Sequence, residues 1–158
     1  MTGQEEKRLN DFFVHVFNKI TIWENQALTC TKTKDLSLKE LHVLEAVAEH
    51  SLSGQDTMAA IADTLSIRAS SLTASVNTLV RKGYLSRIHD EEDRRLIHIA
   101  LTEKGEEANR LHSEFHTQMI RGAVKGLSET ELAVLLQSLT QLNHFFTDMI
   151  RIGTPDRG

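Results

Sequence analysis

A run of opposite charges stands directly before an apolar segment in the second half of the chain. Residues 89–98 read HDEEDRRLIH, with four carboxylates in succession followed by two arginines. An arginine that enters a DNA minor groove gains from the negative potential there, but fixing its side chain costs about 2 kcal/mol of conformational entropy. A carboxylate two residues away can hold the guanidinium in a fixed orientation before DNA binds and so reduce this entropic cost. The spacing is compatible with Asp93 as the orienter of a groove-inserting Arg95 and with Arg94 as a phosphate contact, an interpretation that a preceding helix-turn-helix would favour. The alternative is an exposed charged loop, which contributes little to stability.

A second group of residues has side chains that bind metal ions. His112 and His116 are four residues apart, so both imidazoles would lie on one face of a helix, an arrangement that can chelate zinc. Further potential ligands are Glu24, Cys30 and His42. The zinc-protease pattern needs a glutamate directly after the first histidine, and that position is Ser113 here. Since a glycine-rich phosphate loop and a convincing Ser/His/Asp set are also missing from the sequence, we expect no enzyme; a small metal-dependent hydrolase is the disfavoured alternative.

The composition predicts one domain in the cytoplasm. The 158 residues can bury a core without disulfides, the single cysteine cannot form an intrachain one, and the charged N-terminus lacks an apolar signal segment. No apolar run approaches the roughly 20 residues that span a bilayer, so we expect no membrane association. The net charge of −4 argues against a protein that coats nucleic acid everywhere. However, the stretch between Asp63 and Asp90 contains no carboxylate and several cations, which indicates a local nucleic-acid contact surface unless the gap arose by chance.

Apolar periodicity and capping residues predict the elements that would position these side chains. Residues 9–28 repeat apolar positions at steps of three and four, which indicates a long amphipathic helix. Ser37 can cap a second helix, whose predicted inward positions are Leu38, Leu41, Leu44 and Val47. A loop is expected at 51–55. Two short helices at 57–64 and about 69–82 then suggest a helix-turn-helix.

The second short helix has two different faces. Its apolar residues form a stripe that we expect to be buried, and Gly83 is placed to end it in a left-handed conformation. Small and polar side chains on the opposite face would let another surface come close, although an ordinary solvated face looks similar. The residues expected to face base edges or phosphates are Ser70, Ser71, Thr73, Ala74 and Asn77. The cations expected at the DNA are Arg68, Arg81, Lys82 and Arg87.

After the helix-turn-helix, the sequence pattern changes to a period of two residues, which is typical of strands. Residues 84–89 and 95–102 predict the two strands of a hairpin, with the charge run at its tip. Thr102 can cap a helix to about residue 125. Ser128 and Glu131 form a capping box for a last helix to about residue 152.

The predicted fold class is therefore mainly α with a small β-hairpin wing, a winged helix-turn-helix with terminal dimerisation helices. We expect a single domain over residues 1–158, with the winged helix-turn-helix at about 37–102 and the dimerisation helices at about 5–30 and 103–152. The terminal helices have more apolar surface than a small winged-helix core can cover, so we expect a homodimer; a monomer with a larger helical core is the alternative. A helix fits the DNA major groove and a hairpin reaches the adjacent minor groove, so the expected partner is double-stranded DNA.

Two segments resemble the MarR family of bacterial transcription regulators. The string DEEDRRLIHIALTEKG at 90–105 is similar to the family's wing, an Asp-x-Arg followed by a strand and Leu-Thr-x-x-Gly. The string AAIADTLSIRASSLTASVNTLVRKGYL at 59–85 is similar to its helix-turn-helix. The resemblance implies a homodimer that binds a pseudopalindrome as two half-sites about one helical turn apart and acts as a repressor. Two residues depart from the pattern: Arg68 occupies the usual small N-cap position, and Ser66 replaces a common glycine.

The resemblance also implies an effector pocket between the dimerisation helices and the DNA-binding part. The residues expected there are Phe13, Phe17, Glu24, Cys30, His42, His112 and His116, although the phenylalanines could equally be core and each histidine a hydrogen-bonded interface residue. The segments RLNDFFVHVFN (8–18), DLSLKELH (35–42) and RLHSEFH (110–116) are most similar to the family's fatty-acid-synthesis repressors, which respond to acyl groups on their carrier protein. Zinc-uptake repressors of the family use similar positions, but they place a glutamate where this chain has Leu41. We therefore expect the effector to be an acyl-carrier protein or a small molecule, with zinc as the alternative. We expect no cofactor.

Overall fold

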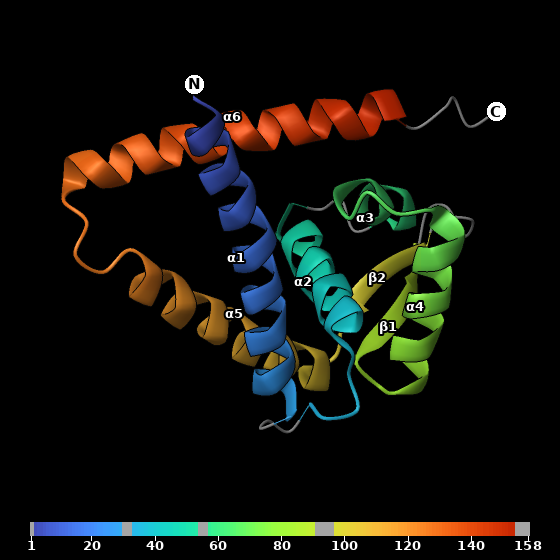
Figure 1. The fold of residues 1–158 in the computed structure, drawn as a ribbon. Helices are drawn as coiled ribbons and strands as arrows, with labels where there is room; N and C mark the ends of the chain where they lie inside the picture. The colour runs from blue at the N-terminus through green and yellow to red at the C-terminus, as the bar shows by residue number, and fades with distance from the viewer. Residues whose placement is uncertain (1, 30–32, 54–56, 91–96, 154–158) are drawn as a thin grey trace. The chain divides into compact units, whose positions relative to one another are not determined.

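The computed structural model describes residues 2–29, 33–53, 57–90 and 97–153. The chain falls into two compact units, Met1–Phe115 and His116–Gly158. The first contains α1 to α4, the hairpin β1–β2 and the beginning of α5; the second contains the rest of α5 and α6 (Figure 1). The bounds are α1 Gly3–Thr29, α2 Leu38–Ser53, α3 Met58–Thr64, α4 Ala69–Arg81, β1 Leu85–His89, β2 Ile97–Leu101, α5 Glu103–Ala123 and α6 Glu129–Gly153. Among the described residues, no helix has the length and apolar character that crossing a bilayer requires.

Helix α2 is the centre of the first unit's core. It contacts α1, α3, α4 and β2, and Figure 1 shows it among these elements. The predicted inward residues Leu41, Leu44 and Val47 are buried, whereas Leu38 is only half-buried. The helix continues to Ser53, so the loop expected from residue 51 was wrong for its first three positions, and residues 54–56 lie outside the described part.

The predicted caps begin the helices as expected. The backbone N–H of Ser37 donates to Glu40 Oε2 at 2.7 Å, and the N–H of Glu40 donates back to Ser37 Oγ at 3.3 Å. Ser128 and Glu131 repeat this capping box before α6, with corresponding distances of 2.8 and 3.3 Å. Each box satisfies two backbone donors that a helix N-terminus otherwise leaves unpaired.

The predicted hairpin is confirmed. Strands β1 and β2 pair antiparallel, in a register that places Leu85 opposite Leu101 and His89 opposite Ile97. Ile99 is fully buried against the core, so one face of β2 closes the first unit. Gly83 ends α4 with φ of 79°, the left-handed conformation expected at a helix C-terminus.

The turn between α3 and α4 is closed by backbone hydrogen bonds. The N–H of Ile67 donates to the carbonyl of Ala62 at 3.1 Å, and the N–H of Ser66 donates to Asp63 at 3.0 Å. Ser66 has φ of 52°, so a side chain occupies a left-handed position that suits glycine. Arg68 is the N-cap of α4 but makes no side-chain capping bond. Both departures from the family pattern therefore leave the expected geometry in place at some cost in stability.

Replacing Ser66 by glycine is expected to raise the free energy of unfolding by about 0.5–1 kcal/mol, because relief of the left-handed strain outweighs the extra chain entropy of glycine. Chemical denaturation of the variant measures the change. Ser113→Gly, at an exposed position within α5, is the control and should lower stability by about 0.5–1 kcal/mol. Equal effects of the two substitutions would contradict the strain at Ser66.

Candidate nucleic-acid interface

Helix α4 presents one face to the core and the other to solvent. Leu72, Val76 and Leu79 are buried, as predicted, while Val80 is half-buried. The exposed row is composed of small or polar side chains and contains no carboxylate. Its members are Ser70, Ser71, Thr73, Ala74, Asn77 and Arg81. A helix with such a face can enter a DNA groove closely, because its exposed row has no carboxylate and, apart from Arg81, only short side chains.

Asn77 is held by a residue of the wing. The Nη2 of Arg87, on β1, donates to Asn77 Oδ1 at 2.6 Å. Because a guanidinium can only donate hydrogen bonds, the amide oxygen of Asn77 must face it, and the amide NH2 is left to donate elsewhere. Such a donor matches a phosphate oxygen or the N7 of a purine. Sequence reasoning placed both residues at the DNA but did not connect them.

The contact between Asn77 and Arg87 predicts that their contributions to DNA binding are coupled. Asn77→Ala and Arg87→Ala should each weaken binding by about 1–2 kcal/mol, and the double variant should fall short of the sum by at least about 0.5 kcal/mol. Anisotropy titrations of the four proteins against one labelled duplex give this double-mutant cycle. Additive losses would show that the two side chains act independently.

Lys82 is engaged within the protein. Its Nζ lies 2.8 Å from Glu40 Oε1 and also donates to the backbone carbonyl of Asp35. Burial raises the pKa of Glu40, but hydrogen bonds from Lys82 and Ser37 outweigh it, so the pKa lies below its usual value. The phosphate contact expected of Lys82 would have to share or break these bonds. Glu40 and Asp35 are far from Lys82 in sequence, so no local pattern indicated the contact.

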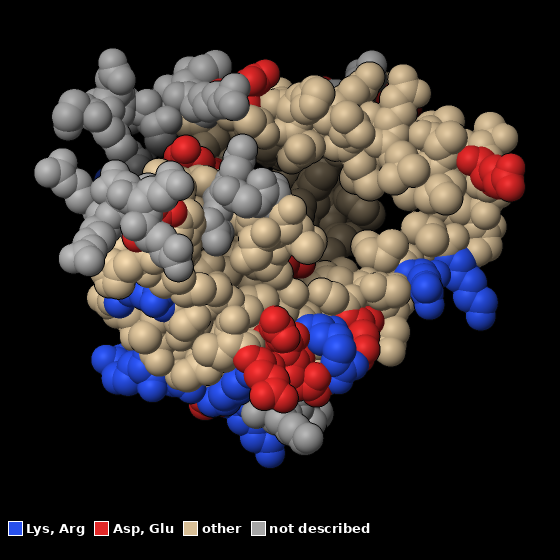
Figure 2. All heavy atoms as spheres, turned by 180° about the vertical axis from the view of Figure 1, so that it is seen from behind, with Lys and Arg blue, Asp and Glu red and all other residues tan. Residues whose placement is uncertain are grey.

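The other cations at α4 are exposed. Arg68 lies at the start of the helix, and Arg81, at its end, donates to Thr78 Oγ1 at 3.3 Å. Figure 2 shows acidic and basic side chains side by side along the lower edge of the face opposite to that of Figure 1, rather than one broad basic field. The wing-tip residues Asp93, Arg94 and Arg95 lie outside the described residues.

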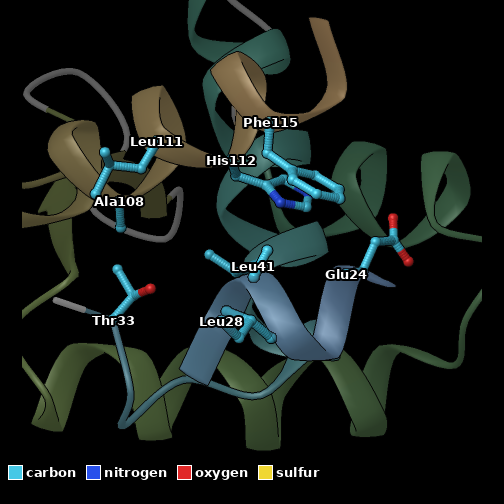
Figure 3. Close-up of a pocket in the computed structure, with 9 residues that line it drawn as sticks. Glu24, Leu28, Thr33, Leu41, Ala108, Leu111, His112 and Phe115 are labelled. Atoms are coloured by element: carbon cyan, nitrogen blue, oxygen red, sulfur yellow. The ribbon is translucent and has the colours of Figure 1, made fainter. Parts of the chain in front are cut away.

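A small cavity in the first unit contains part of the predicted effector pocket. It has a volume of about 30 Å³, enough for about two water molecules and too small for an acyl chain without rearrangement. Figure 3 shows Glu24 and Thr33 at opposite ends of the lining, with His112 and Leu41 between them. Glu24, Thr33 and His112 are all buried, so the cavity has polar walls in an otherwise apolar core.

The structure brings together only some of the residues expected to bind an effector. Glu24 and His112 line the cavity, and the ring of His42 lies 5.7 Å from that of His112, centroid to centroid. Phe13 and Phe17 stack on one another with centroids 6.1 Å apart and are not among the described residues that line it. His116 belongs to the second unit, and Cys30 lies outside the described residues.

His112 also approaches a carboxylate, since its Nε2 lies 3.8 Å from Glu45 Oε2. Nevertheless, within the ranges that the structure describes, no three side chains of His, Cys, Asp or Glu are grouped so that they could hold a metal ion. The alternative of zinc sensing therefore has no support from the described residues. Sequence reasoning missed Thr33, which carries no metal-binding group and lies outside any helix.

Comparison with known proteins identifies the family. A sequence profile described as the MarR family matches residues 34–96. The HTH-type transcriptional regulator YpoP of Bacillus subtilis (strain 168) is 32% identical over 110 residues, which cover 70% of this chain and 76% of that protein. The structure of Streptococcus pneumoniae FabT in complex with DNA superposes with a TM-score of 0.83 at 34% identity, covering 91% of this chain and 99% of that one. The S. aureus MepR–DNA complex shares the fold, with a TM-score of 0.72 at 22% identity over 87% of this chain and 99% of that one. A relative at this identity over most of both chains, together with the profile match and the exposed face of α4, shows that the chain belongs to the MarR family of transcriptional regulators.

Proposed function

We propose that this regulator is a repressor that binds a pseudopalindromic operator as a homodimer, with α4 of each subunit in a major groove. The observation that carries the proposal is the exposed, carboxylate-free row on α4 beside the Asn77–Arg87 contact. The DNA complex of the similar FabT supports it. In this arrangement the half-sites lie about 34–36 Å apart, centre to centre.

The terminal helices supply the proposed dimer interface. Leu9, Phe12 and Phe17 of α1 are each about half exposed. Helix α6 leaves apolar side chains uncovered along its length, among them Leu136, Leu139, Phe145 and Ile150. Exposed apolar surface on this scale marks a protein–protein interface. We accordingly treat residues 1–158 as one MarR-like domain in which α1, α5 and α6 dimerise and residues 37–102 bind DNA.

The wing is proposed to add contacts beside α4. In this proposal Arg95 enters the minor groove, Asp93 orients it and Arg94 contacts phosphate. The hairpin supports the proposal because β1 and β2 extend from the end of α4, and Arg87 of β1 bonds to Asn77 on the DNA-facing row.

We further propose that the regulated genes belong to fatty-acid synthesis and that acyl groups on a carrier protein are the effector. This proposal is supported by three sequence segments, 8–18, 35–42 and 110–116, which resemble the family's fatty-acid-synthesis repressors. Two of these segments contribute residues that line the cavity. An acyl chain would have to enlarge the cavity of about 30 Å³, so binding should be accompanied by a conformational change. The protein is proposed to act in the cytoplasm, where its operator is, and not as an enzyme.

Selection from a pool of random-sequence duplexes tests the function. The purified protein should enrich an inverted repeat with half-site centres about 10–10.5 base pairs apart. Enrichment of no sequence would reject the proposed function. The selected duplex is then titrated with protein in the presence of acylated carrier protein, unacylated carrier protein or zinc. A change in affinity with the acylated form alone is expected, and no change in any arm would reject both effectors.

A further inference from the structure

A polar cluster surrounds the C-terminal end of α4. It consists of Asp35, Glu40, Lys82, Tyr84 and Lys104, called here the Asp35 cluster. The hydroxyl of Tyr84 donates to Asp35 Oδ1 at 2.7 Å. The Nζ of Lys82 donates to the backbone carbonyl of Asp35 and lies 2.8 Å from Glu40 Oε1. Asp35 is therefore bonded both to the residue that follows α4 and to the residue that precedes β1.

Lys104 brings a third element into the same cluster. From the first turn of α5, its Nζ donates to the backbone carbonyl of Lys82 at 3.0 Å and lies 3.9 Å from the centroid of the Tyr84 ring. The same nitrogen is 3.9 Å from Asp35 Oδ2. The turn before α2, the end of α4 and the start of α5 are thus joined by charge-assisted and cation–π contacts.

Burial makes the bond between Tyr84 and Asp35 specific. Tyr84 is 1% exposed, so its hydroxyl depends on Asp35 as a protein acceptor. Burial raises the pKa of Tyr84, and the hydrogen bond to Asp35 raises it further. In the opposite sense, the bond from Tyr84 holds the pKa of the Asp35 carboxyl below its usual value, with smaller contributions from Lys104 and Lys82.

The Asp35 cluster is also connected to the cavity. Thr33 lines the cavity, and its carbonyl accepts from the N–H of Leu36 at 2.9 Å, which closes a tight turn that contains Asp35. Thr33 of the cavity lining and Asp35 of the cluster therefore belong to one hydrogen-bonded turn.

We propose that Asp35 is a positioning residue for DNA recognition, which fixes the end of α4 and the beginning of the wing relative to α2. The proposal rests on the proposed function, because α4 must be the element that reads DNA. Asp35 itself touches no DNA in this account. It acts through the acceptor that it offers to Tyr84.

Simple electrostatics and this positioning role predict opposite results. Removing a carboxylate from a protein that binds a polyanion should strengthen DNA binding if charge alone matters. If Asp35 positions α4, loss of its side-chain acceptor should weaken binding despite the more favourable charge.

Two substitutions of Asp35 separate these effects because they change the net charge equally. Asp35→Ala removes the acceptor for Tyr84, and we expect binding to the duplex selected by the wild-type protein to weaken about tenfold, the order that one charge-assisted hydrogen bond contributes. Asp35→Asn keeps an amide oxygen that accepts from Tyr84, so its affinity should stay within about threefold of wild type. Tyr84→Phe should reproduce the loss of Asp35→Ala, and the double variant should bind no more weakly than Asp35→Ala alone. Glu49→Gln, which removes an exposed carboxylate from α2, is the charge control.

The measurements are anisotropy titrations over a range of salt concentrations, with thermal unfolding to show that each variant is folded. The slope of affinity against salt should be unchanged in all variants, because no phosphate contact is lost. Tyr84 is the only tyrosine in the chain, so absorbance titration of tyrosinate reports it alone. Both Asp35 variants should ionise Tyr84 at lower pH than wild type.

The outcomes distinguish a failure of the proposed function from a failure of the positioning role of Asp35. If the wild-type protein selects no duplex, the proposed function fails. If it does, but Asp35→Ala and Asp35→Asn bind equally well, the positioning role of Asp35 is overturned. A Tyr84→Phe variant that binds as tightly as the wild type would likewise overturn it, because the bond between Tyr84 and Asp35 would then not position α4.

Discussion

Replacing Ala74 by glutamate is expected to weaken operator binding at least about a hundredfold, because bringing like charges together at an interface costs several kcal/mol. Ala74 lies in the middle of the exposed row of α4, one turn from Ser70 and from Asn77. A carboxylate there would enter the groove between two phosphate backbones. The backbone carbonyl of Ala74 accepts a hydrogen bond from Thr78 Oγ1 at 3.1 Å, and the substitution leaves this bond in place.

The matched control for Ala74→Glu is Ala74→Gln, which has nearly the same size without the charge. Glutamine should weaken binding less than glutamate, and the difference between them measures the electrostatic part. Ala123→Glu adds the same charge to a different helix, at the exposed end of α5, and should have little effect. Anisotropy titration against the selected duplex supplies all three affinities. Equal affinities of the glutamate and glutamine variants would place α4 outside the groove.

Replacing Gly105 by alanine is expected to lower the free energy of unfolding by about 3 kcal/mol, the upper range for overpacking of a core. A Cβ at this position would lie only 2.1 Å from the backbone oxygen of Tyr84 and 3.2 Å from Leu101 Cδ2. The same oxygen accepts from the N–H of Thr102 at 3.0 Å, so it cannot move without opening the joint between the wing and α5.

Gly122 provides the control for Gly105 because it lies in the same helix with nothing within 4 Å of an added Cβ. Gly122→Ala should stabilise the protein by about 0.5–1 kcal/mol, since alanine loses less entropy in a helix. Urea denaturation of both variants gives the two changes. A Gly105→Ala variant as stable as wild type would contradict the close packing of α5 against the end of α4.

Local patterns in the sequence were sufficient to predict the elements of this fold. The steps of three and four along α1, the cap at Ser37, the capping box at Ser128 and Gly83 at the end of α4 are all properties of a few adjacent residues. The period of two in the wing is equally local. Since each element buries one face, these patterns also predicted most of the core, including Leu44 and Val76.

Contacts between distant residues could not be predicted in this way. Lys82 looked like a phosphate contact because it follows α4, yet its partners Asp35 and Glu40 come from another part of the chain. The bond from Arg87 to Asn77 depends on how β1 leaves α4, which periodicity does not determine. The small volume of the cavity depends on how several elements pack, so the size of the effector pocket was also beyond sequence reasoning.

The spacing of the two half-sites shows whether a homodimer reads DNA with two copies of α4. The affinity of the wild-type protein is measured for the selected operator and for the same operator with about five base pairs inserted at its centre, which turns the half-sites to opposite faces of the duplex. We predict that the insertion reduces affinity to nearly that of an unrelated duplex, a loss of at least about a thousandfold at physiological salt. Equal affinity for the two duplexes would contradict the account.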